Sequence, residues 1–218
     1  MAQIAIVGGN GKIARHLIEA LKDQGHTPLA LVRNHDHASE LEALGATVGI
    51  LDIENSTDED FGKAFHGSDA IVFAAGGGPD GNIERKRTVD FEGSVKSIAG
   101  AKLAGIHRFV QISAMSVDKP VPEGSGAVWA AYAEAKRDAD VALRASALDW
   151  TIIRPGALLD EEPTGLITLG DELPRGQIPR ADVARVLAEV VSDDRTIGKQ
   201  WDVVSGSTEI AAAVAAAV

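Results

Sequence analysis

The chain has 218 residues, a formal net charge of −11 and no cysteine. This length suits one sizeable domain or one domain with a small appendage, the charge argues against nucleic acid as a partner, and the missing cysteines exclude disulfides, thiolate catalysis and zinc–thiolate sites. No apolar run reaches the length of a membrane span and the first residues lack the features of a signal peptide, so we expect a cytoplasmic protein that does not bind membranes.

Short apolar runs alternate with segments of helical periodicity up to residue 153. The predicted strands, in chain order, cover residues 4–7, 27–32, 47–51, 70–74, 108–112 and 150–153. The predicted helices cover residues 13–24, 39–44, 58–65, 85–104 and 127–145. This alternation implies right-handed βαβ units and a parallel sheet with helices on both faces. We therefore predict an α/β fold, a doubly wound Rossmann sheet in the strand order 3-2-1-4-5-6.

The pattern changes after Pro155. Residues 156–180 are rich in glycine and proline, which predicts a loop region with one short strand at 166–169, at the place where a doubly wound enzyme has a substrate lid. The periodicity then predicts a helix at 182–192, an extra C-terminal strand at 200–204 and a terminal helix at 209–217. We predict a single domain over residues 1–218 that includes this small lid region.

The glycine-rich turn after the first strand carries the strongest functional signal. Gly9-x-Gly11-x-x-Ala14 fits the dinucleotide fingerprint, and so does Gly8-x-x-Gly11-x-x-Ala14. One glycine allows the tight strand-to-helix turn, another lets the backbone approach a pyrophosphate, and the small third residue lets helix and strand pack closely. The helix N-terminus then presents free N–H groups to the phosphates. The alternative is an ordinary glycine-rich turn without a ligand.

The end of the second strand indicates which dinucleotide binds. NAD-binding folds carry an acidic residue there for the ribose hydroxyls, but this chain has Arg33, whose guanidinium suits a 2′-phosphate. We therefore predict NADP rather than NAD. The alternatives are that Arg33 is a solvated surface residue and that Asp36 binds the ribose. Asp52, which ends the third strand, is either the adenine contact or a cap of its own loop.

Tyr132 and Lys136 form the second chemical signal. Tyr132 is the only tyrosine in the chain, and a spacing of four residues places both side chains on one face of a helix. In a reductase the lysine ammonium lowers the phenol pKa, and the tyrosine exchanges a proton with the substrate oxygen while hydride moves to or from nicotinamide. The same lysine can hold the nicotinamide ribose. A structural pair on a helix face is the alternative.

Six short stretches occur in the order seen in short-chain dehydrogenase/reductases. They are VGGNGKIAR at 7–15, FAAGGG at 73–78, VDFEGS at 89–94, FVQIS at 109–113, YAEAK at 132–136 and IIRPG at 152–156. Together they extend over nearly the whole chain. The chain most resembles the atypical, NAD(P)-binding members of that family that are described as epimerase/dehydratase-like.

This resemblance implies that NADP lies along the carboxyl edge of the sheet. It implies a pyrophosphate site formed by Gly8, Asn10, Gly11, Lys12 and Ile13. It implies an adenine-side ribose site against Ala74, Ala75 and Gly76. It places Tyr132 and Lys136 near the nicotinamide, in a pocket shaped by Pro155 and Gly156.

The family's catalytic serine or threonine lies just past the fifth strand, where this chain reads ISAMS at 112–116. Ser113 and Ser116 are both candidates for this role, but Ala114 occupies one register in which the hydroxyl is expected. Arg154 has two interpretations, a ligand of a substrate carboxylate or a member of a structural ion pair.

These features predict an NADP-dependent oxidoreductase that moves hydride to or from a small carbonyl, enol or alcohol substrate. One alternative is a regulator that senses NADP(H) without turnover, and another is a flavin or quinone reductase that does not need Tyr132. Nucleotide-sugar epimerases of the extended group carry a larger C-terminal substrate domain, so we do not expect sugar-nucleotide chemistry. We expect a monomer or homodimer with a small-molecule substrate and no metal.

Overall fold

The computed structural model describes residues 1–78 and 81–218. The strands are β1 (Gln3–Val7), β2 (Thr27–Val32), β3 (Thr47–Ile50), β4 (Ala70–Phe73), β5 (Arg108–Ile112), β6 (Asp149–Pro155), β7 (Ala157–Leu159), β8 (Leu166–Gly170), β9 (Gln177–Pro179), β10 (Lys199–Ser205) and β11 (Thr208–Glu209). The helices are α1 (Lys12–Asp23), α2 (Ala38–Leu44), α3 (Asp58–Phe65), α4 (Ile83–Arg85), the π-helix η1 (Lys86–Glu92), α5 (Gly93–Ala104), α6 (Ala127–Arg144), α7 (Arg180–Val191), the 3₁₀ helix η2 (Asp194–Thr196) and α8 (Ile210–Ala217).

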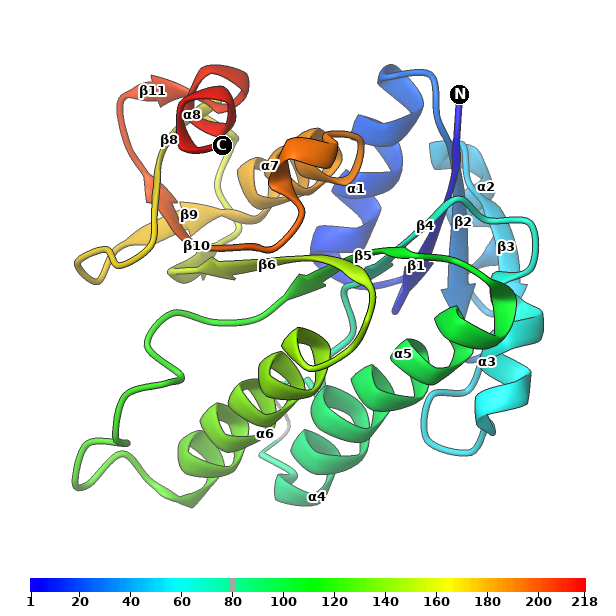
Figure 1. Ribbon diagram of the computed structural model, residues 1–218, viewed down its shortest axis with the longest axis horizontal. Coiled ribbons are helices and arrows are strands. Elements are labelled where there is room, and N and C mark those ends of the chain that lie inside the picture. The colour runs from blue at the N-terminus through cyan, green and yellow to red at the C-terminus, as the bar shows by residue number, and fades with distance from the viewer. Residues whose placement is uncertain (79–80) are drawn as a thin grey trace.

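Within the described residues, nine strands form one sheet in the order β11-β8-β10-β6-β5-β4-β1-β2-β3. The six strands from β3 to β6 are parallel and follow the predicted order 3-2-1-4-5-6. The predicted extra strand is β10, which lies parallel to β6. Figure 1 shows α1, α7 and α8 on one face of this sheet and α3, α5 and α6 on the other. The prediction of a doubly wound α/β fold is confirmed.

Each face of the sheet buries its own apolar cluster, because strand side chains alternate between the two faces. In β1, Ile4 and Ile6 belong to the cluster under α1 and α7, whereas Ala5 and Val7 belong to the cluster under α3 and α5. A strand that is buried on both faces reads as a continuous apolar run, which is typical of parallel sheets.

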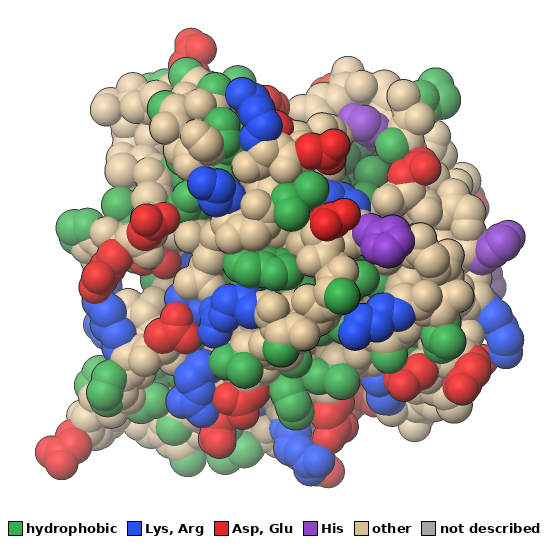
Figure 2. Space-filling model, in the orientation of Figure 1, with side chains coloured by type: hydrophobic (Ala, Val, Ile, Leu, Met, Phe, Trp, Pro, Cys, Tyr) green, Lys and Arg blue, Asp and Glu red, His purple; other side chains and the backbone are tan. Residues whose placement is uncertain are grey.

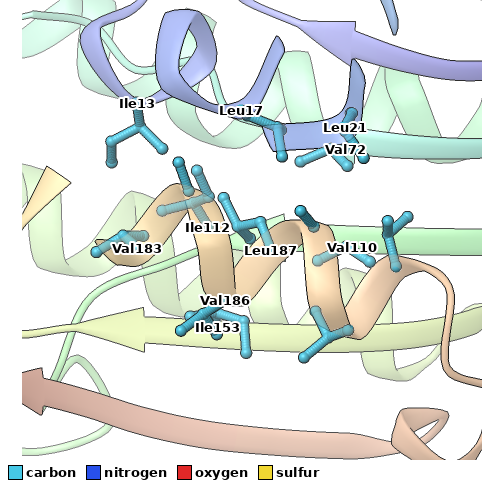
Figure 3. Packing of buried hydrophobic residues seen from close by; sticks show 14 of the residues in the cluster. Ile13, Leu17, Leu21, Val72, Val110, Ile112, Ile153, Val183, Val186 and Leu187 are labelled. Atoms are coloured by element: carbon cyan, nitrogen blue, oxygen red, sulfur yellow. The ribbon is translucent and has the colours of Figure 1, made fainter. Parts of the chain in front are cut away.

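Helices α1 and α7 pack against each other above the middle of the sheet. Figure 3 shows Leu17 and Leu21 of α1 facing Leu187 of α7, with Val110 and Ile153 of the sheet nearby. This packing fixes the direction of α1, and therefore the position of the glycine turn at its N-terminus.

The predicted helix at 85–104 is wrong in its first half, where the structure has the short helix α4 and the π-helical segment η1 before α5. Helical periodicity cannot distinguish π from α hydrogen bonding. Tertiary contacts decide here, because Lys86 and Asp90 are both buried, with Lys86 donating to the Gly78 carbonyl and Asp90 accepting from the Gly77 N–H. Single π turns are frequent at functional sites.

The predicted loop region at 156–180 contains more regular structure than expected. The expected strand at 166–169 is present as β8, but it joins the main sheet antiparallel to β10. The short strands β7 and β9 pair with each other. Gly156 precedes β7, and β9 follows Gly176 and ends at Pro179, so glycine and proline bound the short strands instead of keeping the whole segment irregular.

Candidate functional site

Two cavities lie at the carboxyl ends of the parallel strands. The first, of about 420 Å³, is formed by the segments that follow β1, β2, β3 and β4. Its wall includes eight of the residues expected to bind the cofactor: Gly8, Asn10, Gly11, Arg33, Asp52, Ala74, Ala75 and Gly76. The fold therefore brings four separate sequence segments together at the place where a dinucleotide is expected.

Two positions of the glycine turn leave little space for a side chain. Gly8 has a φ of 81°, in the left-handed region, and a Cβ there would lie 2.8 Å from the Cα of Ala75. A Cβ at Gly11 would lie 3.2 Å from the carbonyl oxygen of Gly8. Gly11 is also the N-cap residue of α1, and no side chain in the described part of the molecule caps this end of the helix. The N–H groups of the first turn are therefore available to hydrogen-bond a ligand. This cradle fits a pyrophosphate group.

The other two residues expected at the pyrophosphate lie differently. Ile13 is buried in the core under α1. The exposed Lys12 ammonium forms an ion pair with Asp160 at 2.5 Å, and the second oxygen of that carboxylate pairs with Arg180 at 2.6 Å. The Asp160 carboxylate therefore links the glycine turn to the start of α7.

The three residues considered for the ribose and adenine contacts, Arg33, Asp36 and Asp52, all line the first cavity. The pKa of Asp52 is lowered, chiefly because the Asn55 side chain donates a hydrogen bond to its carboxylate, with a smaller effect from the Arg33 charge. Asp52 also accepts the Glu54 N–H at 3.1 Å. Its side chain thus caps its own loop, as the second interpretation of this residue predicts, while it still lines the cavity.

The second cavity, of about 830 Å³, lies at the carboxyl ends of β5 and β6. Its wall includes Ser113, Ser116, Tyr132, Pro155 and Gly156. The segment between β5 and α6 extends to the lower left of Figure 1, and Figure 2 shows a hollow between that segment and the part of the molecule above it. Because β4 and β5 are neighbours in the sheet, the two cavities lie side by side along one edge.

Tyr132 and Lys136 share one face of α6, but only Tyr132 lines the second cavity. The Lys136 ammonium lies 5.9 Å from the centre of the Tyr132 ring, donates to the Ile112 carbonyl at 3.1 Å and forms an ion pair with Asp90 at 3.2 Å. Both ionised side chains are buried, with 5% and 1% of their surface exposed. Burial is the largest single effect and lowers the pKa of Lys136, but Asp90, Tyr132 and Asp140 together outweigh it, so the pKa is raised and the ammonium persists.

The pKa of Tyr132 moves in the direction opposite to the sequence prediction. Burial raises the pKa of the phenol, the Lys136 ammonium lowers it, and Asp90 and Asp140 raise it. The net direction is upward, because loss of solvent destabilises the phenolate more than an ammonium shared with Asp90 stabilises it. The phenol therefore remains protonated at neutral pH.

Ser113 belongs to a buried polar network behind the second cavity. Its hydroxyl donates to Asp140 at 2.7 Å, and the same carboxylate accepts from Gln111 at 2.7 Å and from Arg154 at 2.7 Å. A hydroxyl has one proton, so Ser113 can donate to a substrate oxygen only after it releases Asp140. Arg154 also pairs with Asp118 at 2.6 Å, which makes this arginine part of a structural ion pair.

Sequence reasoning missed Asp90 and Asp140. Asp140 follows Lys136 by four residues, as Lys136 follows Tyr132, so the three polar residues lie on one face of a helix that otherwise buries alanine and leucine. That spacing could have identified Asp140 from the sequence. The sequence evidence for Asp90 is weaker. Asp90 lies in the VDFEGS stretch, but it meets Lys136 only because η1 packs against α6.

Among residues 1–78 and 81–218, no group of three or more His, Asp or Glu side chains is placed to hold a metal ion. None of the helices described is long and apolar enough to pass through a membrane.

Comparison with known proteins identifies the family. The sequence profile of the NAD(P)H-binding family matches residues 8–194. The chain is 35% identical over 213 residues to the uncharacterized sugar epimerase YhfK of Bacillus subtilis, which covers 97% of this chain and 98% of that protein.

Solved structures agree with this match. A protein of Bacillus halodurans described as an NAD-dependent epimerase/dehydratase is 39% identical, with a TM-score of 0.92 over 99% of this chain and 100% of that one. The oxidoreductase ylbE of Lactococcus lactis is 31% identical, with a TM-score of 0.87 over 98% of this chain and 95% of that one. The chain therefore belongs to the NAD(P)H-binding family.

Proposed function

We propose that the protein is an NADP-dependent oxidoreductase that transfers hydride to or from a carbonyl or alcohol carbon held in the second cavity. One observation carries the proposal. The only tyrosine of the chain faces that cavity, with a buried ammonium fixed behind it, directly beside a glycine cradle that fits a dinucleotide. An acid group next to a cofactor site is what carbonyl reduction requires.

In the proposed reaction, bound NADPH would supply the hydride, and residues of this chain supply the proton. Tyr132 gives its phenol proton to the carbonyl oxygen as hydride reaches the carbonyl carbon, so the products are the alcohol and the oxidised cofactor. Lys136 stabilises the phenolate that remains, and Asp90 holds the ammonium in place. Oxidation of the alcohol reverses each of these transfers.

Because its pKa is raised, Tyr132 is protonated near neutral pH, which is the form that carbonyl reduction requires of its general acid. The direct test follows loss of NADPH absorbance against a panel of carbonyl compounds, with identification of the alcohol by mass spectrometry. An epimerase, the activity in the name of the Bacillus subtilis relative, returns hydride to its substrate and consumes no NADPH. Substrate inversion without net oxidation would therefore replace this proposal.

A regulator that senses NADP(H) is the second candidate, and the Ser113 hydroxyl favours it. That hydroxyl is directed at Asp140, so the cavity lacks one ready donor for a substrate oxygen. A sensor predicts no turnover with any carbonyl and a partner interaction that changes with NADPH. A flavin or quinone reductase predicts NADPH oxidation that survives loss of the Tyr132 hydroxyl.

Replacing Arg33 with alanine should reduce the preference for NADPH over NADH by about tenfold. The guanidinium is expected to bind the 2′-phosphate, and an exposed charge-assisted contact of this kind contributes on the order of 1–2 kcal/mol. Calorimetric titration of both cofactors measures the change. Lys102→Ala, at an exposed position on α5, is the matched control. Equal affinities for NADPH and NADH in the unchanged protein would contradict the assignment.

Replacing Gly11 with valine should remove dinucleotide binding while the fold survives. The backbone φ of Gly11 is −65°, which valine adopts, and the nearest obstacle to a Cβ is one carbonyl oxygen at 3.2 Å. The branched side chain would nevertheless fill the space expected for the pyrophosphate. Calorimetry would measure affinity, and circular dichroism would check the fold. Unchanged affinity in a folded variant would place the cofactor elsewhere.

A further inference from the structure

The second cavity has a positive wall in a protein of formal net charge −11. Its lining includes two arginines, Arg175 and Arg180, and among the described residues that line it there is no aspartate or glutamate. Arg180 is held by Asp160 at 2.6 Å and by the Leu158 carbonyl. Arg175, on the turn between β8 and β9, forms no ion pair or hydrogen bond with the part of the chain that the structure describes.

The remainder of the wall is largely apolar. Met115, Pro122 and Leu158 line it, and Trp129 stands beside Tyr132 with 5.5 Å between the two ring centres. Trp129 is 42% exposed, although a tryptophan ring gains much from burial. An exposed aromatic ring on the wall of a cavity offers a flat surface to a ligand.

The turn that carries Arg175 is held by contacts on both sides. Glu172 on this turn forms an ion pair with Lys119, on the segment between β5 and α6. Backbone bonds hold the other side, with the Ala157 N–H donating to the Gly176 carbonyl at 2.9 Å. Arg175 therefore lines the cavity from a backbone that is tied on both sides.

We propose that the substrate of this site is a carbonyl compound with a flat apolar body and an anionic group, the body lying on Trp129 and the anion binding Arg175. That the ligand contains a carbonyl group rests on the proposed function. That it contains an anionic group rests on the residues of the cavity wall alone. Over residues 1–78 and 81–218, the Arg175 guanidinium has no partner in the protein, and the cavity wall contributes no carboxylate. A ligand with an anionic group, most directly a carboxylate, would supply that partner.

The test compares two ligands that cannot react, 2-naphthoate and 2-naphthamide, which share a ring system and differ in charge. Calorimetry with the NADP-loaded protein should show naphthoate binding about tenfold tighter than naphthamide. Arg175→Gln should bring the two affinities within about twofold of each other, and Arg175→Lys should restore part of the difference. Arg195→Gln, an exposed arginine paired with Asp193, removes the same charge away from the cavity and should change nothing.

Each outcome decides the proposal. Equal binding of the two ligands to the unchanged protein, or an equal loss in Arg175→Gln and Arg195→Gln, would overturn it. Trp129→Ala should weaken both ligands by a similar factor, and unchanged binding would remove the aromatic surface from the proposal. If naphthoate discrimination depends on Arg175 but no carbonyl is reduced by NADPH, the anion site stands and the proposed reaction fails. If NADPH reduces a carbonyl compound but the protein does not prefer naphthoate to naphthamide, the proposed reaction stands and the anion site fails.

Discussion

Tyr132→Phe should lower turnover of a carbonyl substrate by about 10²–10⁴-fold, the usual contribution of a general acid. The change removes one hydroxyl from a ring that lines the second cavity and leaves the ring packing against Trp129 in place. NADPH affinity should hardly change, because the phenol lies on the wall of the second cavity and not the first. Stopped-flow measurement of NADPH oxidation at saturating substrate, together with calorimetry of cofactor binding, separates the two quantities.

The pH profile gives a second readout of the same group. The pKa of Tyr132 is raised above its ordinary value, so its protonated form persists through neutral pH and is lost only at high pH. Reduction should therefore stay constant through neutral pH and decline in the alkaline range, and Tyr132→Phe should abolish that decline along with most of the rate. Ser125→Ala, which removes a hydroxyl from a half-buried position on the cavity wall, serves as a control. Full turnover in Tyr132→Phe would exclude tyrosine as the acid.

Lys136→Met should lower the free energy of unfolding by about 3–5 kcal/mol, because it leaves a buried carboxylate without its partner. Asp90 is 1% exposed, and its second oxygen is already engaged by the Gly77 N–H at 2.8 Å. The same change should weaken NADPH binding and reduce turnover, since the ammonium is expected to serve the nicotinamide ribose and the phenolate. Urea denaturation measures the first effect, and calorimetry and kinetics the others.

The double variant Lys136→Met with Asp90→Asn is the control for that result. The asparagine carries no charge but keeps an oxygen that can accept the Gly77 N–H. Much of the stability lost in Lys136→Met should therefore return, while activity should not. If the double variant is no more stable than Lys136→Met, the loss comes from packing of the lysine stem and not from the unpaired carboxylate.

The raised pKa of Lys136 makes the free energy of unfolding depend on pH. The folded-state pKa of Lys136 is raised above its unfolded value, so its contribution to stability is fully present below the unfolded pKa and is lost as pH rises through the folded pKa. The unchanged protein should lose this part of its stability only in strongly alkaline solution. The double variant should show no such loss in that range.

Local patterns in the sequence determined the scaffold of this protein. The apolar runs and the helical spacing depend on backbone geometry over a few residues, so they predicted the parallel strands, their order and the glycine cradle at Gly8 and Gly11. The same kind of spacing placed Tyr132 and Lys136 on one helix face. Errors fell where local signals are ambiguous, in the π-helical segment η1 and in the short strands between residues 156 and 180.

The tertiary structure alone decided the chemistry of the site. Asp90 and Lys136 meet only because η1 packs on α6, and Asp140 receives Ser113 and Arg154 only because α6 covers β5 and β6. The pKa of Tyr132 rose instead of falling for the same reason, since the cost of burying a charge depends on everything that surrounds it. Burial and the pairing of distant charges are properties of the packed molecule, and no short stretch of sequence contains them.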